Sequence, residues 1–277
     1  MLFRSERSQP ENSELRLEID SLSITNEEGL RVLDNVSFSL ESGEILGIAG
    51  IAGSGQRELL EAVAGLQKVE TGGRITYYPP NGGQEEELLG KSPLKIRDLG
   101  VRLSFVPEDR LGMGLVGSMD IVDNMMLRSY RRGKSVFLDR KAPADLADEI
   151  ISSLRISTPS PATAVRKLSG GNVQKVLVGR EIAAAPTVLM AAYPVRGLDI
   201  NSSYMIYNLL NQQKKNGVGV IFVGEDLDVL LALCDRILVI SAGRVSGIVD
   251  ARTASKEEIG LLMVKTNIQT EEGGEEA

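Results

Sequence analysis

Two segments near the start of the chain alternate apolar and polar residues. They are LRLEIDSLSI (15–24) and RVLDNVSFSL (31–40), and the turn-prone NEEG lies between them. Alternation with a period of two is typical of strands that bury one face. We therefore expect an antiparallel β subdomain in this part of the chain.

Farther along, near-continuous apolar segments alternate with helical ones. Apolar strands are expected at GEILGIAG (43–50), TVLMAA (187–192), VGVIFVG (218–224) and RILVIS (236–241). Helices are expected at 56–66, 202–215, 226–234 and 255–264, and another begins near Gly171. Strands that alternate with helices predict an α/β core with a mainly parallel sheet covered on both faces.

The middle of the chain departs from this alternation. Residues 71–93 are rich in turn formers, which predicts short strands and an exposed loop. The pattern is mostly helical from Ile121, most clearly in ADLADEIISSLRI (144–156), and it ends in the proline-broken STPSPAT. This predicts a helical subdomain, about residues 113–167, inserted into a single domain over 15–265. A flexible N-terminal tail (1–14) and an acidic C-terminal tail (266–277) are expected to flank it.

Composition narrows the classes of function. The 277 residues carry a formal net charge of −7, which argues against a nucleic-acid partner. With no histidine and only Cys234, the chain has no internal disulfide, and zinc sites and histidine-based catalysis are excluded. No apolar run approaches the roughly 18 residues of a membrane span, and the N-terminus is not signal-like. We expect a cytoplasmic protein that other chains would have to hold at a membrane.

One glycine-rich segment has the spacing of a phosphate-binding loop. GIAGSGQRE (50–58) lies between an expected strand and an expected helix, which is the context such a loop requires. The residues concerned are Gly50, Gly53, Ser54, Gly55, Gln56 and Arg57. Gln56 and Arg57 stand where the motif continues with Lys and then Ser or Thr. The segment is therefore a weakened nucleotide site or a glycine-rich turn.

A second glycine-containing motif, KLSGGNVQK (167–175), begins another helix. Taken alone, Ser169 is a good N-cap and the two glycines allow close packing. The motif also resembles the signature of ABC ATPases. That resemblance implies that the serine hydroxyl, the glycine amides and the helix N-terminus close over the γ-phosphate of a nucleotide held by an opposite subunit.

Further motifs carry the same resemblance over roughly residues 15–265. AAYPVRGLD (191–199) is similar to a Walker B strand with its D-loop, FVPEDR (105–110) to a Q-loop, and Glu225 follows an apolar strand at the position of the switch histidine. Together with LSGGN they resemble the second half of carbohydrate and nucleoside importer ATPases. In that family two ABC domains are usually fused and the second is catalytically degenerate, whereas this chain has the length of one.

The resemblance implies that no catalytic residue is intact. The degenerate positions are Glu108 at the Q-loop, Ala192 and Tyr193 in Walker B, and Glu225 at the switch. No aromatic residue precedes Ser37 in the domain to stack on adenine, and none of these positions supplies a metal ligand. The substitutions reflect either chance drift or release from hydrolysis of a site that remains structural.

By contrast, the residues that act on a partner's site match the family pattern. They are Leu168, Ser169, Gly170, Gly171, Asn172 and Gln174 in the signature, with Gly197, Leu198 and Asp199 in the D-loop. The resemblance implies that ATP binds mainly at a site shared with a second, competent ABC domain, and that Mg²⁺ is held only there. It also implies permease subunits as partners, a solute-binding protein as an indirect one, and a place on the cytoplasmic face of the cell membrane.

Four alternatives remain open at the level of the sequence. Arg57 either replaces part of the missing metal charge or is a solvated or salt-bridged surface arginine. Four methionines, Met113, Met119, Met125 and Met126, form either a docking surface for the permease or helical core. The chain as a whole could also be a self-sufficient ATPase or a non-transport ABC protein.

Overall fold

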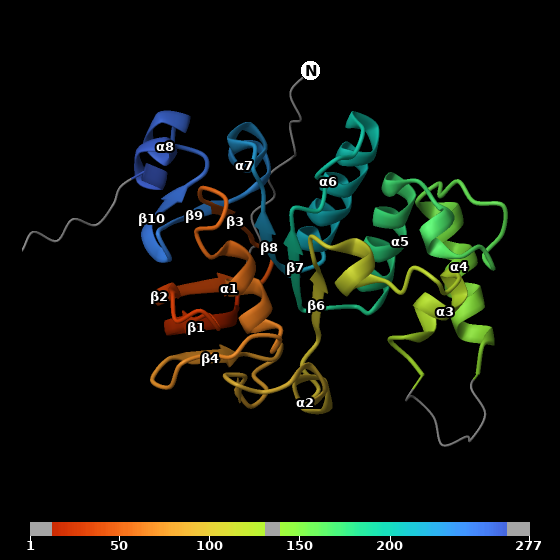
Figure 1. Ribbon diagram of the computed structural model, residues 1–277, viewed down its shortest axis with the longest axis horizontal. Helices are drawn as coiled ribbons and strands as arrows, with labels where there is room; N and C mark the ends of the chain where they lie inside the picture. Colours follow the sequence, from red (N-terminus) through yellow and green to blue (C-terminus); the bar gives the residue numbers. More distant parts are fainter. Residues whose placement is uncertain (1–12, 131–138, 265–277) are drawn as a thin grey trace, which may run out of the picture.

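Two sheets and eight α-helices make up the described part of the chain. The computed structural model describes residues 13–130 and 139–264. The expected acidic tail and nearly all of the expected N-terminal tail lie outside the described residues. Figure 1 shows the two sheets at the centre and left, and a helical region at the right.

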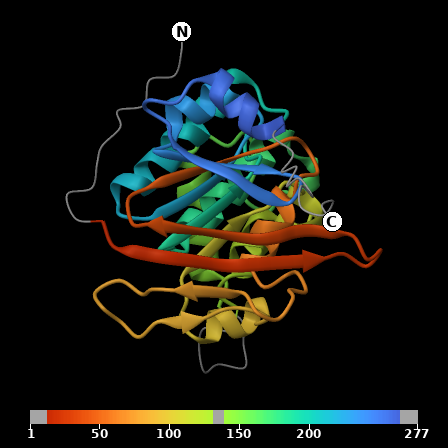
Figure 2. The same cartoon turned by 90° about the vertical axis from the view of Figure 1, so that its left-hand side faces the viewer.

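The smaller sheet is antiparallel and contains the alternating segments. It comprises β1 (Leu15–Thr25), β2 (Arg31–Glu41), β4 (Arg74–Tyr77) and β5 (Glu86–Glu87) in the order β2-β1-β4-β5. Leu17 pairs with Leu40 and Ile19 with Phe38, and all four side chains are buried. Figure 2 shows β2 next to the larger sheet and β4 and β5 farthest from it. The predicted antiparallel subdomain is thus confirmed.

The larger sheet is parallel except at one edge. Its order is β10-β9-β3-β8-β7-β6, and only β10 runs antiparallel to its neighbour. The strands are β3 (Ile45–Ala49), β6 (Leu103–Val106), β7 (Val188–Ala192), β8 (Gly219–Val223), β9 (Arg236–Ser241) and β10 (Arg244–Asp250). Every residue of β3, β7 and β8 is buried, which explains their continuous apolar sequences.

Helices and the smaller sheet cover the two faces of this sheet. Leu46 and Ile48 of β3 belong to a core shared with α1 (Gln56–Val63) and the antiparallel sheet. Ile45 and Ala49 belong to a second core shared with α5 (Gly170–Ala183), α6 (Ile200–Lys215) and α7 (Leu227–Leu233). The helix α8 (Lys256–Val264) joins this second core through buried Ile259. This arrangement confirms the predicted α/β core with layers on both faces.

A helical segment is inserted between β6 and β7. It contains a π-turn (Arg110–Gly114), α3 (Ile121–Met126), α4 (Lys141–Ser153), a 3₁₀ turn (Val165–Lys167) and the start of α5. The buried Asn124 bonds both the N–H and the carbonyl of Val116, which fixes the loop before α3. The methionines divide: Met125 is buried in the core, whereas Met113 and Met119 are exposed.

Two short elements were not anticipated from the pattern of residues. The helix α2 (Pro93–Asp98) buries only Ile96, and β6 has four residues. Such lengths are too short to establish a period of 3.6 or 2. Ser92 as N-cap and Pro93 in the first turn are nevertheless the usual start signals of a helix, and they mark α2.

Candidate functional site

The glycine loop follows β3 and leads directly into α1. Gly55 is the N-cap of α1 with a φ of 103°, and a Cβ built on it would lie 2.7 Å from the carbonyl oxygen of Val32. A Cβ on Gly50 would lie 2.6 Å from the carbonyl oxygen of Ile240. Both positions therefore require glycine, and the backbone keeps the shape of a phosphate-binding loop.

Gln56 turns back onto this loop. Its side chain is 2% exposed, and its Nε2 donates a hydrogen bond of 3.0 Å to the carbonyl oxygen of Ile51. The same nitrogen would lie 2.5 Å from a Cβ on Gly50. The side chain at the position of the missing lysine is thus neutral and already hydrogen-bonded within the loop.

Arg57 is ion-paired along α1. Its Nε lies 3.2 Å from Oε1 of Glu61 and 3.8 Å from Oε1 of Glu58, and 59% of its side chain is exposed. It also lines a hollow of about 350 Å³ together with Glu61, Glu108 and Asp109. Three carboxylates and one guanidinium give this hollow a negative balance. The geometry favours the salt-bridged alternative for Arg57.

The degenerate positions meet where three neighbouring strands end. Glu108 follows β6, Tyr193 follows β7 and Glu225 follows β8, and these strands are adjacent in the sheet. Ala192 is the last residue of β7 and is 1% exposed, so its methyl group belongs to the core. Tyr193 has a φ of 47° and donates its backbone N–H to the carbonyl of Val223.

Arg196 occupies the centre of this group, and its role was not foreseen from the sequence. Its Nη1 forms an ion pair with Oε1 of Glu108, and its Nε lies 3.4 Å from Oε1 of Glu225. Its guanidinium also lies 5.8 Å from the centre of the Tyr193 ring, within the range of a cation–π contact. The sequence offered a partial signal, because Glu108 and Glu225 are two acidic residues near the strand ends on either side of β7.

Tyr193 remains neutral in these surroundings. Burial is the main cause that raises its pKa, and the negative charges of Glu108 and Glu225 raise it further. Arg196 acts in the opposite direction. A phenol whose pKa lies above its ordinary value of about 10 is not a base at neutral pH. Tyr193 itself is therefore not a base that could activate a water molecule.

The signature loop is held by a set of local hydrogen bonds. Ser169 caps α5, and its Oγ accepts from Nδ2 of Asn172 at 3.0 Å. Asn172 also bonds the backbone N–H and carbonyl of Ser157 at 3.1 and 3.2 Å. Ser169 and Gly170 are exposed, and the first turn of α5 contains no acidic residue. The positive end of the helix dipole is thus left open to solvent.

Two residues of the predicted signature set do not belong to this exposed surface. Leu168 is half-buried against the core, where it packs beside the start of α5. Gln174 is 1% exposed, and its side-chain amide has no hydrogen-bond partner among the described residues. Gln174 is thus enclosed by its own helix and core in this chain, and its action on a partner's site stays a prediction.

The D-loop lies against the signature loop. Asp199 caps α6 by accepting from the N–H of Ser202 at 3.0 Å and from its hydroxyl at 2.7 Å. These hydrogen bonds lower the pKa of Asp199 and keep it ionised. A Cβ on Gly171 would lie 3.4 Å from the Ser202 hydroxyl oxygen. Gly197 makes the turn with a φ of 69°, and Leu198 packs on the core.

Arg110 joins the two loops. Its Nη2 donates to the backbone carbonyl of Arg196, and a Cβ on Gly170 would lie 3.3 Å from its Nη1. Partial burial lowers its pKa from an ordinary value above 12, which leaves it charged at neutral pH. The signature loop, the D-loop and the degenerate strand ends are consequently in continuous contact.

Comparison with known proteins agrees with this geometry. A family model described as ABC transporter matches residues 33–194, more than half of the chain. The chain belongs to the ABC transporter family. The dimeric bacterial ABC transporter cassette MJ0796 superposes on this ABC domain with a TM-score of 0.71 at 22% identity, covering 86% of this chain and 100% of that one. The fold is therefore that of an ABC ATPase cassette.

Curated relatives of this ABC domain are import proteins. It is 36% identical over 264 residues to the guanosine import ATP-binding protein NupO of Bacillus subtilis, covering 94% of this chain and 50% of that protein. It is 37% identical over 257 residues to the ribose import ATP-binding protein RbsA 1 of Rubrobacter xylanophilus, covering 91% and 48%. The chain thus spans about half the length of the curated relatives it matches.

ATP with Mg²⁺ is the usual ligand of ABC domains, but the residues around this glycine loop do not fit it. The amide of Gln56 is engaged with the loop itself, and Glu108 and Glu225 are paired with Arg196. Within residues 13–130 and 139–264, no group of three or more carboxylate, cysteine or histidine side chains is placed to hold a metal ion. Neither the phosphate charge nor the metal would be compensated here.

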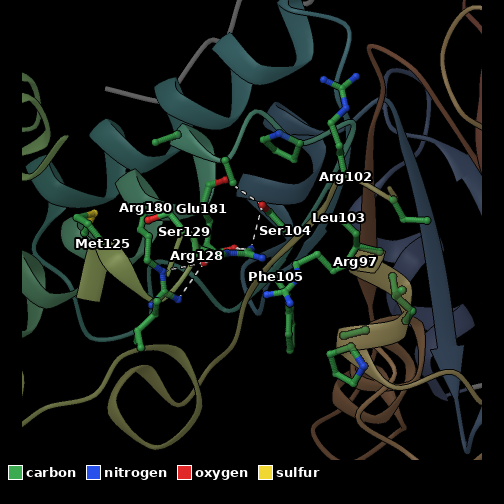
Figure 3. A pocket seen from close by; sticks show the side chains of 18 of the residues that line it. Arg97, Arg102, Leu103, Ser104, Phe105, Met125, Arg128, Ser129, Arg180 and Glu181 are labelled. Atoms are coloured by element: carbon green, nitrogen blue, oxygen red, sulfur yellow. Dashed lines mark hydrogen bonds and ion pairs between the residues drawn. The ribbon is translucent and has the colours of Figure 1, made fainter. Parts of the chain in front are cut away.

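A groove on another part of the ABC domain separates α2 and β6 from the helical insertion. It encloses about 610 Å³ and includes the C-terminal end of α5. Figure 3 shows Arg128 and Arg180 converging on Glu181, with Ser104 beside them. Burial, and secondarily Arg128, lower the pKa of Arg180 to about 10. Arg97 and Arg102 also line the groove, which gives it a positive balance.

No helix among the described residues is both long and apolar enough to cross a bilayer.

Proposed function

We propose that this chain is an ATP-binding subunit of an importer for simple sugars or nucleosides. Its own nucleotide site does not hydrolyse ATP, and its LSGGN loop completes the site of a second, competent ABC domain. The observation that carries the proposal is the contrast between the two regions. The acidic strand ends are closed by their own ion pairs, whereas Ser169 and Gly170 are exposed at the start of α5, which has no acidic residue in its first turn.

Electrostatics supports a site without hydrolysis. A lysine about 4 Å from a phosphate charge contributes about 4 kcal/mol at an effective dielectric constant near 20, and neutral Gln56 supplies none of this. Glu58 in the first turn of α1 further offsets the helix dipole. Ala192 and Tyr193 provide neither a metal-orienting carboxylate nor a general base. Release of this site from hydrolysis explains all the substitutions together.

The relatives support the importer and its class of solute. Guanosine and ribose are named for two relatives of more than 35% identity. The chain spans about half of each relative, and we propose that a second ABC domain completes its site. The residues at Glu108, Ala192, Tyr193 and Glu225 support the proposal that this chain acts as the second half.

The groove supports contact with permease subunits. Its walls combine apolar residues such as Leu94, Phe105 and Leu146 with a positive balance of charge. A cytoplasmic permease loop with apolar and acidic residues would fit these walls. The chain would then lie on the inner face of the membrane, and the solute-binding protein would act on it only through the permease.

ATP turnover of the assembled complex tests this proposal. The complex is purified through a tag on this chain, together with its competent ABC partner and permease. We expect Ser169→Ala to lower turnover by at least about tenfold, because the serine hydroxyl acts on the partner's nucleotide. Gln56→Ala, the matched change at the other loop, should leave turnover within about twofold.

The same preparation separates the alternatives. Turnover by this chain alone, abolished by Ser169→Ala, would show a self-sufficient ATPase and overturn the proposal. Equal effects of Ser169→Ala and Gln56→Ala would also contradict it, because the two loops would then act alike.

A further inference from the structure

We propose that Arg196 and Arg110 are positioning residues that hold the signature loop and the D-loop in place without nucleotide in this chain's own site. This inference rests on the proposed function, because its main readout is hydrolysis by the competent partner. It assigns a role to two arginines that the family motifs leave unassigned.

Arg196 links three strand ends through one side chain. It extends from the turn after β7 to Glu108 after β6 and to Glu225 after β8. Both carboxylates carry negative charge on either side of the end of β7, and Arg196 is ion-paired with each of them. The guanidinium is therefore the cation around which this edge of the sheet is arranged.

The backbone of Arg196 carries the arrangement to the signature loop. Its carbonyl oxygen accepts from Arg110, whose guanidinium lies against Gly170. On the other side of the loop, Gly171 faces Ser202, which is bonded to Asp199 of the D-loop. The signature glycines are thus bounded on both sides by groups tied to the turn 193–199.

The ion pairs of Arg196 are exposed, unlike the buried contacts that stabilise the fold. The Arg196 side chain is 56% exposed, and exposed ion pairs contribute little to global stability. Their effect is local, since they select one arrangement of a turn and a loop. Loss of Arg196 should therefore lower the fraction of molecules whose signature loop is competent to bind, and leave the cores intact.

The kinetic consequence is specific. When only a fraction of molecules is competent, apparent affinity falls by that fraction, and saturating ligand restores the competent state. In the complex with its competent partner, we expect Arg196→Ala to raise KM for ATP about tenfold and to change kcat less than twofold. Arg196→Lys, which keeps the charge, should raise KM less than about threefold.

Arg31 provides the matched control. It also bridges two carboxylates, Asp34 and Glu70, and 52% of its side chain is exposed, but it lies on β2. Arg31→Ala should leave KM and kcat unchanged. Arg110→Ala should reproduce the rise in KM, and the double variant Arg110→Ala/Arg196→Ala should show no further rise, because both act along one set of contacts.

The outcomes distinguish this inference from the proposed function. If Ser169→Ala abolishes turnover while Arg196→Ala leaves KM unchanged, the signature acts in trans but Arg196 does not position it. Multiplicative effects of the two arginine changes, or an Arg196→Lys variant as impaired as Arg196→Ala, would equally overturn the inference. If Ser169→Ala has no effect, the proposed function itself fails.

Discussion

Two helix starts in this ABC domain contain a glycine-rich loop, and they differ in what surrounds them. At α1 the loop binds its own Gln56 side chain, the N-cap is Gly55, and Glu58 lies in the first turn. At α5 the N-cap is Ser169, the first turn has no acid, and the glycines face solvent or the D-loop. The start of α1 thus has no side-chain cap and an acid in its first turn, whereas the start of α5 is capped by Ser169 and has no acid there.

The difference lies in the side chains around the two loops and less in their glycine backbones. The glycines of the first loop keep their constrained backbone, while neutral and acidic side chains close the space around it. The cost of burying polar groups is avoided because each finds a partner within the chain. Under the proposed function, the first loop would remain ordered without nucleotide and would support the second loop.

The largest expected effect comes from giving the first turn of α5 an acidic residue, as the first turn of α1 has. Gly171→Asp adds a negative charge to the first turn of α5, beside the ionised Asp199. We expect turnover of the assembled complex to fall about 100-fold, because the charge opposes the partner's phosphate. Gly260→Asp in α8, where a Cβ meets nothing within 4 Å, is the control and should not change turnover. Equal losses of turnover in Gly171→Asp and Gly260→Asp would contradict a specific role for the start of α5.

Replacing Gln56 and Arg57 of the α1 loop by the residues usual in a phosphate loop should have a smaller effect, on the affinity for nucleotide. Gln56→Lys combined with Arg57→Thr restores the cation and the hydroxyl of the phosphate loop. We expect the affinity of the chain for Mg²⁺-ATP to rise by about tenfold, since part of the roughly 4 kcal/mol is offset by Glu108 and Glu225. Titration calorimetry measures this, with Gln212→Lys on α6 as the charge-matched control. Hydrolysis should remain absent, and its appearance would show that Ala192 and Tyr193 are not limiting.

We expect variants at the starts of α5 and α1 to differ modestly in their free energy of unfolding. Ser169→Ala removes the hydroxyl that accepts from Asn172, and we expect the free energy of unfolding to fall by about 1 kcal/mol. Arg57→Ala at α1 removes only an exposed ion pair and should change it by less than about 0.5 kcal/mol. Urea denaturation of the two variants measures both values. A larger loss for Arg57→Ala would mean that its pairs organise α1.

The smallest expected effect concerns how the free energy of unfolding depends on pH, through Asp199 near the start of α5 and Tyr193 at the end of β7. Hydrogen bonds from Ser202 lower the pKa of Asp199, so its contribution is present above the unfolded pKa near 4 and is lost as the pH falls below it. Burial raises the pKa of Tyr193, so its contribution is present below about pH 10 and is lost as the pH rises further. The pH dependence of the urea midpoint should be weaker on the acidic side in Ser202→Ala and weaker on the alkaline side in Tyr193→Phe, while other shifted groups such as Glu70 and Tyr207 keep the remainder.

The sequence predicted the layers of the fold well, for a physical reason. Alternation in β1 and β2 and continuous apolar runs in β3, β7 and β8 follow from burial on one face or two. The loop before α5 was also predictable, because its motif is local. The short β6 and α2 gave too few residues for a period.

The interior of the degenerate site could not be predicted in the same way. Arg196 meets Glu108 across 88 residues, and the meeting depends on β6, β7 and β8 being neighbours. The direction of the Gln56 amide depends on the carbonyl of Ile51 and the space above Gly50. Gln174 lies in a motif in which Ser169 is exposed and Asn172 is half-buried, and only the packing of α5 shows that Gln174 is enclosed.

The helix α5 has its two ends in different regions of the molecule. Gly170 begins the helix at the signature loop, and Glu181, 11 residues later in the chain, lies in the arginine-lined groove. At 1.5 Å per residue the two points are roughly 16 Å apart along one rigid rod. Glu181 is ion-paired with Arg128 and Arg180. A displacement of these groove residues would therefore move α5 and, with it, Gly170 at the other end of the helix. A force on one end of α5 would then displace the other end through this one helix.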